Sequence, residues 1–123
     1  MEFENLKKIP HSLEAERALI GGIFYNQDLF DEIRDIVNAG DFYKIEHSSI
    51  YAAIEKVYSE NKGIDGILIE EEIKKSNSKN KDEILEILSD ILDEITSSYN
   101  LLEYANLIKE KAMLRRLGNV GAE

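Results

Sequence analysis

The chain has 123 residues, a formal net charge of −10, no cysteine, and 43% apolar against 33% charged residues. This length and composition are typical of one globular domain, and the lack of cysteine excludes a disulfide framework and a thiol nucleophile. The charge argues against a surface that binds duplex DNA through its phosphates, and the absence of a secretory signal or a bilayer-spanning apolar run predicts a cytoplasmic protein with no membrane contact.

The first predicted helix begins after Ser12 and ends at about residue 25. Ser12 is a suitable N-cap, and Glu14 and Glu16 lie where carboxylates favour the positive end of the helix dipole. Gly21 and Gly22 lie late in this helix, where each costs about 1 kcal/mol relative to alanine. The glycine pair indicates either a helix end or loose packing, or the close approach of a neighbouring helix.

A second predicted helix, which Asn26 or Asp28 can cap, stops near Gly40, a residue that suits the position just after a helix C-terminus. The short connection over residues 41–43 follows it. We expect its two aromatic residues, Phe42 and Tyr43, to fill space in the core between helices.

Three more helices are predicted in the middle of the chain. A third is expected over about residues 46–61, and a turn between two glycines leads to a short fourth helix that ends before Ser76. A polar loop over residues 75–81 precedes the fifth helix, over about 81–95, whose apolar residues recur every three or four positions. Because strand signals are scarce, the sequence predicts an all-α fold.

The last predicted helix runs from about Tyr99 to at least Leu117, after a break at residues 96–98 that can cap it. Its apolar residues surround most of the helix, whereas one core needs only a stripe of about 100°. We therefore expect a partner helix or a second subunit to cover its second apolar side, unless the helix lies at the centre of one bundle.

Motifs for catalysis or nucleotide binding are absent from the sequence. There is no G-x-x-x-x-G-K-[ST] and no G-x-G-x-x-G, so no nucleotide site is predicted in these residues. The two histidines, His11 and His47, are expected to be local polar residues near helix starts. Without cysteine or an H-x-x-x-H pair, a zinc site is not expected.

Basic side chains concentrate in the last predicted helix, at Lys109, Lys111, Arg115 and Arg116. One interpretation is that they complement the negative end of the helix dipole and aid solubility. The other is that they form a small patch that contacts an anionic partner protein or a nucleic-acid strand.

Three blocks of the sequence form a distinctive pattern. Residues 9–22 read Ile-Pro-His-Ser-Leu-Glu-Ala-Glu-Arg-Ala-Leu-Ile-Gly-Gly, residues 41–43 read Asp-Phe-Tyr with a histidine four positions later, and residues 100–117 read Asn-x-x-x-Tyr-Ala-x-x-Ile-x-x-Lys-x-x-Leu-Arg-x-Leu. Together they resemble the N-terminal domain of bacterial replicative DNA helicases of the DnaB type. The family-motif positions are Ser12, Glu14, Glu16, Asp41, Phe42, Tyr43, Asn100, Tyr104, Ile108, Lys111 and Arg115.

The resemblance implies a compact helical bundle over residues 1–97, followed by residues 98–123 as the first part of a helical hairpin, in a single domain overall. In that family, hairpins of neighbouring subunits pair, so it implies a dimer, and a hexameric collar in the full protein. The implied subunit interface contains Leu107, Leu114 and Leu117.

The resemblance also implies partners and a longer parent chain. Primase, and in some cases a helicase loader, would bind the collar. A RecA-like motor domain, absent from these residues, would bind ATP and magnesium and make most of the DNA contact, as part of an ATP-dependent helicase. The domain itself is expected to catalyse no reaction.

Two other functions stay open on the residues alone. One is a free-standing all-α interaction adaptor, such as the helicase-binding domain of a primase. The other is a small all-α hydrolase that uses a metal held by converging carboxylates.

Overall fold

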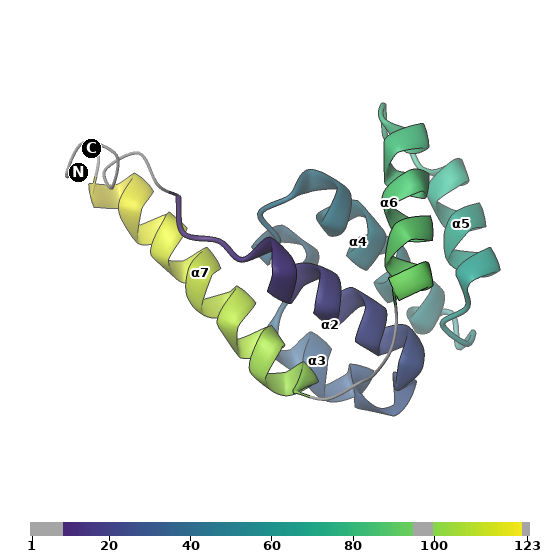
Figure 1. Cartoon of the computed structure of the whole chain (residues 1–123), viewed down its shortest axis with the longest axis horizontal. Helices are drawn as coiled ribbons and strands as arrows, with labels where there is room; N and C mark the ends of the chain where they lie inside the picture. Colours follow the sequence, from purple (N-terminus) through teal and green to yellow (C-terminus); the bar gives the residue numbers. More distant parts are fainter. Residues whose placement is uncertain (1–8, 95–99, 122–123) are drawn as a thin grey trace.

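The computed structural model describes residues 9–94 and 100–121, with side chains as far as residue 118, and within these ranges every regular element is helical (Figure 1). The prediction of an all-α fold is confirmed. The described elements are α2 (Leu13–Tyr25), η1 (Gln27–Leu29), α3 (Phe30–Ile36), η2 (Ala39–Asp41), α4 (Ile45–Ser59), α5 (Gly66–Lys75), α6 (Lys81–Glu94) and α7 (Leu101–Gly121), where η marks a 3₁₀ turn.

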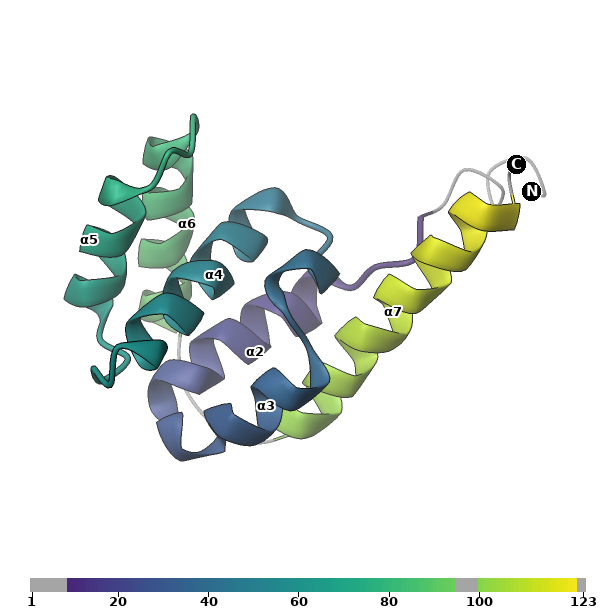
Figure 2. The same ribbon diagram turned by 180° about the vertical axis from the view of Figure 1, so that it is seen from behind.

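Helix α2 is central, because it packs against α4, α6 and α7 (Figures 1 and 2). As predicted, Ser12 caps it, with its hydroxyl oxygen accepting a hydrogen bond from the backbone N–H of Ala15 at 3.2 Å. Leu19, Ile20 and Ile23 are fully buried. These side chains form the part of the core on which the other helices converge.

The second predicted helix is wrong at its C-terminal end. Helix α3 stops at Ile36, and Val37 has extended backbone torsions (φ −126°, ψ 150°). The Asn38 side chain then accepts a hydrogen bond from the Gly40 N–H at 3.0 Å, while Asp41 Oδ2 accepts one from the Asn38 N–H at 2.9 Å. This reciprocal cap starts the separate turn η2. Gly40 has no positive φ, so it is not the left-handed residue that follows a helix.

Helices α5 and α6 lie at the end of the bundle away from α7, and both pack on each other and on α4, as Figures 1 and 2 show. Helix α4 ends in a Schellman motif: Asn61, at φ 62°, donates its N–H to the Tyr58 carbonyl at 3.0 Å, and Lys62 donates to the Val57 carbonyl at 3.3 Å. The predictions of a third, a fourth and a fifth helix are confirmed.

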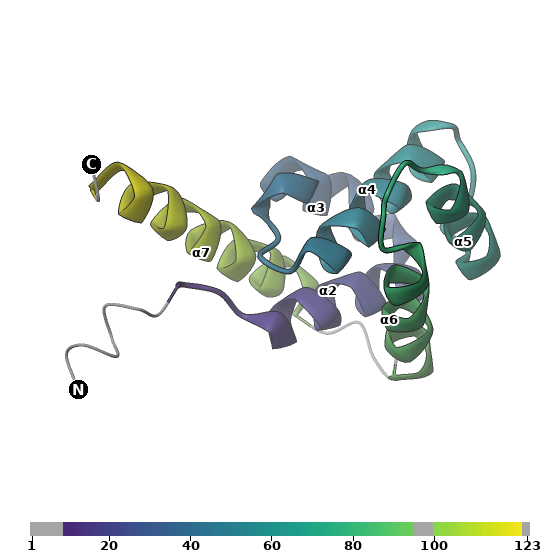
Figure 3. The same cartoon turned by 90° about the horizontal axis from the view of Figure 1, so that it is seen from above.

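Helix α7 packs along α2 and α3 through its first half, and its second half extends away from the bundle (Figures 1 and 3). Leu101, Ala105 and Ile108 are buried in the common core. The predicted break at residues 96–98, the predicted start near Tyr99 and the predicted boundary between residues 97 and 98 lie outside the described residues. Within the described ranges, no helix combines the length and apolarity needed to cross a membrane.

Candidate functional site

Helix α7 is attached to the bundle at two places, the first of which is its N-terminal end. Asn100 has a left-handed φ of 63°, and its carbonyl accepts the hydrogen bond from the Tyr104 N–H at 2.9 Å that opens the helix. Leu101 then packs on Gly22, where a Cβ would overlap the leucine side chain. The close approach that was one interpretation of the glycine pair is therefore confirmed at Gly22, and α2 continues past it to Tyr25.

The second place of attachment is a buried carboxylate. Asp41, the last residue of η2, has no exposed side-chain surface. Its Oδ2 accepts a hydrogen bond from Lys109 Nζ at 3.1 Å, and its Oδ1 accepts one from the Arg116 guanidinium at 2.6 Å. Lys109 and Arg116 lie seven positions apart, about two turns along one face of α7, with the buried Ala112 between them.

Arg115 adds two contacts with backbone carbonyls. Its guanidinium donates to the carbonyl oxygen of Asp41 at 2.6 Å and to that of Pro10 at 2.8 Å, which ties the segment before α2 to α7. The guanidinium also lies 5.5 Å from the centroid of the Tyr43 ring, on which the His11 ring stacks with centroids 4.1 Å apart. We call Asp41, Lys109, Arg115 and Arg116 together the Asp41 clamp.

The surroundings of Asp41 favour its ionised form. Burial alone would raise its pKa, but the backbone hydrogen bond from Asn38 and the ion pairs with Arg116 and Lys109 outweigh burial. The pKa of Asp41 is therefore lowered from its usual value. The clamp holds a charged carboxylate at neutral pH.

A second buried carboxylate, that of Glu16, joins α2 to the start of α4. Its Oε2 accepts from the Tyr43 N–H at 2.7 Å, and its Oε1 accepts from the Lys44 N–H at 3.3 Å and from His47 Nδ1 at 2.8 Å. Because both oxygens face donors, we assign an ionised carboxylate and a proton on Nδ1. Lys44, the N-cap of α4, makes no side-chain cap hydrogen bond, and its backbone N–H is bound by Glu16 of another helix.

This role of Glu16 differs from the predicted one, because its carboxylate binds the N-terminus of α4 rather than that of its own helix. A signal for it was present in the sequence. Glu16 lies three and four positions before Leu19 and Ile20, so it belongs to the buried face of α2. A charged residue at that place in an apolar row indicates a buried partner.

The basic residues of α7 have a role that neither sequence interpretation named. Lys109, Arg115 and Arg116 bind groups of residues that precede them by 68 to 105 positions. The last turn of α7 has no basic residue, so the interpretation as dipole complementation is wrong. Lys111 is not part of the clamp, and contact of these residues with DNA stays a prediction.

The family-motif positions differ in burial. Phe42 is buried as predicted, with its ring centroid 4.8 Å from that of Tyr51, but Tyr43 is exposed and does not fill the core. Among the others, Ile108 is buried, Tyr104 and Lys111 are partly buried, and Glu14 is exposed.

Next to the Asp41 clamp, the outer half of α7 presents apolar side chains that the described residues leave exposed. Met113, Leu114 and Leu117 are 54%, 43% and 66% exposed. Leu107, the third residue of the predicted interface, is instead partly buried against the core of its own bundle. The second apolar side expected for this helix is therefore present in its outer half, where it is exposed.

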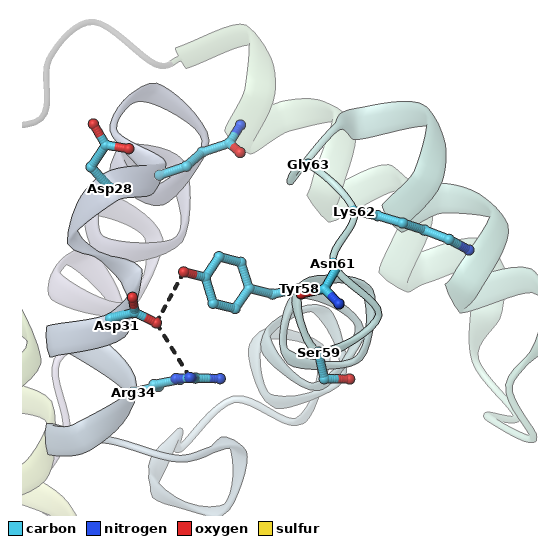
Figure 4. A pocket seen from close by; sticks show the side chains of 9 residues that line it. Asp28, Asp31, Arg34, Tyr58, Ser59, Asn61, Lys62 and Gly63 are labelled. Atoms are coloured by element: carbon cyan, nitrogen blue, oxygen red, sulfur yellow. Dashed lines mark hydrogen bonds and ion pairs between the residues drawn. The ribbon is translucent and has the colours of Figure 1, made fainter.

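An open hollow between α3 and the end of α4 has polar walls (Figure 4). Asp31 accepts a hydrogen bond from the Tyr58 hydroxyl at 2.9 Å and pairs with Arg34 at 3.3 Å, so these groups satisfy one another. Over residues 9–94 and 100–121, no group of three or more His, Asp or Glu side chains is arranged to hold a metal ion.

The described residues form a small all-α domain whose last helix projects from the bundle. Comparison with known proteins supplies the family. The sequence model described as "DnaB-like helicase N terminal domain" matches residues 8–110, and the chain belongs to this family.

Individual relatives agree with this assignment. The chain is 32% identical over 112 residues to the "Replicative DNA helicase DnaB" of Haemophilus influenzae and to that of Leifsonia xyli subsp. xyli. Each alignment covers 91% of this chain but 24% of the relative, so the chain spans about a quarter of their length. Its fold is similar to the crystal structure of the N-terminal domain of DnaB helicase from Mycobacterium tuberculosis, with a TM-score of 0.84 and 26% identity over 94% of this chain and 82% of that chain.

Proposed function

We propose that this domain joins the subunits of a replicative DNA helicase into a collar and docks primase on that collar. The observation that carries the proposal is the exposed apolar end of α7, formed by Met113, Leu114 and Leu117. Removal of apolar surface from water is the main favourable contribution to most protein–protein association. Family membership supports the same function, because the relatives are replicative helicases by name.

The mechanism is burial of like surfaces against each other. In a two-fold pair the same patch on both subunits faces itself, so one apolar helix end is enough to build a contact. Three side chains give a small interface, and small interfaces are weak. We therefore expect a dimer that forms at micromolar concentrations, with the hexamer depending on the rest of the parent protein.

The other partners follow from the helicase assignment. In the parent protein, ATP and magnesium would bind to a motor domain outside these 123 residues, since this sequence has no P-loop motif. A net charge of −10 disfavours contact of this domain with DNA phosphates, so most DNA contact would be made by that motor domain. The surface of this domain would instead bind primase and a helicase loader.

Self-association is tested by sedimentation velocity of the chain from low to high micromolar concentration. We expect a concentration-dependent dimer that Leu114→Asp weakens, because pairing would bury an unpaired charge. Ile67→Asp is the matched control, since Ile67 is 71% exposed on α5, a helix distinct from α7. A chain that stays monomeric throughout, or equal effects of the two substitutions, would refute pairing through this patch.

Primase docking is tested by isothermal titration of the chain with the C-terminal domain of primase from the same organism. Saturable binding supports the proposal, and no binding with both proteins at high micromolar concentration contradicts it. Sequencing the gene downstream of codon 123 separates the helicase from a free-standing adaptor, because only the helicase encodes a P-loop motor there.

A further inference from the structure

We propose that Asp41 is a positioning residue that sets the direction in which α7 leaves the bundle. Through that direction it controls how well the apolar ends of two α7 helices align. The second statement rests on the proposed function, in which α7 mediates self-association, whereas the first concerns a single chain.

The argument begins with the two places where α7 is attached. Leu101 sits on Gly22, and Arg116 binds Asp41. On α7 itself, Leu101 and Arg116 are 15 residues apart, which is about 22 Å along a helix that rises about 1.5 Å per residue. A rigid helix held at one point can pivot, but a helix held at two distant points has a fixed direction.

Apolar packing secures only the inner part of this helix. Of the described side chains after Ile108, only that of Ala112 is fully buried, and an alanine buries little surface. The outer attachment is polar: Lys109 and Arg116 bind the Asp41 carboxylate. Arg115 adds bonds to the backbone carbonyls of Asp41 and Pro10. The direction of the outer half therefore depends on the Asp41 clamp more than on the core.

The clamp lies next to the proposed interface. Leu114 and Leu117 flank Arg115 and Arg116 in the sequence, so a displacement of the clamp moves both leucines. In a two-fold pair, a tilt of one α7 is repeated in its copy, so the two helix ends are misaligned by both tilts together. Loss of the Asp41 charge should therefore weaken pairing although Asp41 lies on η2, outside the apolar patch.

The direction of α7 can be measured by spin labelling, because the chain has no cysteine of its own. Labels are attached at Glu86→Cys, on an exposed position of α6, and at Gly118→Cys, where a Cβ has no neighbour within 4 Å. Pulsed electron resonance, with an excess of unlabelled chain, then reports the distance between α7 and the bundle. We expect a narrow distribution of label-to-label distances when Asp41 is present and a broadened or shifted distribution in Asp41→Asn.

Asp93→Asn is the matched control, because it removes the same charge from an exposed position on α6. It should leave the distance distribution unchanged. If circular dichroism shows that Asp41→Asn is unfolded, the same distance is measured in Arg116→Gln. The Arg116 side chain is 54% exposed and can be replaced without leaving a cavity. A folded variant that loses the clamp yet keeps the narrow distribution would overturn the proposal.

Self-association of the unlabelled variants is measured separately by sedimentation equilibrium. We expect Asp41→Asn to raise the dimer dissociation constant by roughly 5- to 150-fold, the usual range of coupling between sites, and Asp93→Asn to leave it unchanged. If the unsubstituted chain never dimerises, the proposed function is refuted. The distance measurement still tests the direction of α7 in that case. If Asp41→Asn dimerises as tightly as the unsubstituted chain, the link between the direction of α7 and pairing is refuted.

Discussion

Glu16 of α2 and His47 of α4 meet in the core, 31 positions apart in the sequence, with 2.8 Å between Oε1 and Nδ1. Their side chains are only 2% and 1% exposed. The same carboxylate accepts hydrogen bonds from the backbone of Tyr43 and Lys44. A buried carboxylate needs such donors because its desolvation is otherwise uncompensated. One side chain therefore connects α2, the connection after η2 and the first turn of α4.

Glu16→Gln is expected to lower the free energy of unfolding by about 2–4 kcal/mol, because the amide nitrogen would face an N–H donor and the charge would be lost. Urea denaturation followed by circular dichroism measures the change. Glu14→Gln, on the exposed face of the same helix, should change stability by no more than about 0.5 kcal/mol. Similar losses in the two variants would show that the Glu16 network contributes nothing specific.

The Asp41 clamp predicts a loss of stability in acid. Because the pKa of Asp41 is lowered in the folded chain, its contribution is fully present above the unfolded pKa of about 3.9 and is lost as the pH falls through the folded value. Thermal melts of the parent and of Asp41→Asn, taken from neutral pH downward, measure this. The difference between the two should shrink below about pH 4. A constant difference would mean that the carboxylate is not ionised in the folded chain.

Gly22→Ala is expected to destabilise the fold by about 1–3 kcal/mol, because the new Cβ collides with the Leu101 side chain and displaces the start of α7. The better helix propensity of alanine offsets up to about 1 kcal/mol of this loss. Gly118→Ala is the control: it lies in α7 with nothing near its Cβ, so propensity alone should stabilise the chain. Chemical denaturation of both variants provides the comparison, and a stabilising Gly22→Ala would contradict the close packing.

Tyr51 predicts a loss of stability in alkali. Burial, with smaller contributions from Glu55 and Asp41, raises the pKa of its hydroxyl, which donates a hydrogen bond to the Val37 carbonyl at 3.0 Å. The folded chain therefore keeps Tyr51 neutral, and stability falls as the pH rises past about 10, where the unfolded chain ionises. Tyr51→Phe should cost about 1 kcal/mol at neutral pH and reduce the alkaline loss, as thermal melts would show. An unchanged alkaline loss in this variant would assign it to other groups.

The helices that could be predicted are those with strong local signals. Ser12 has the side chain of an N-cap, and the rows of apolar residues in α4 and α6 have helical spacing, so their spans follow from neighbouring residues alone. The end of α3 was missed, although its signal was also local. Asn38 and Asp41 have the three-residue spacing of a reciprocal cap, which starts a new turn after Val37 leaves the helix.

The amino-acid sequence by itself determined the helical class, most helix spans and, through the motif blocks, the family. Only the tertiary structure decided what the charged motif residues do. Asp41 and Arg116 are 75 positions apart, and Glu16 and His47 are 31 apart. Helix propensity and capping act over a few residues, whereas the partner of a buried charge depends on which distant surfaces the packed helices bring together. The sequence therefore predicted a solvent-facing patch of basic residues on α7, whereas in the fold Lys109, Arg115 and Arg116 attach this helix to the bundle.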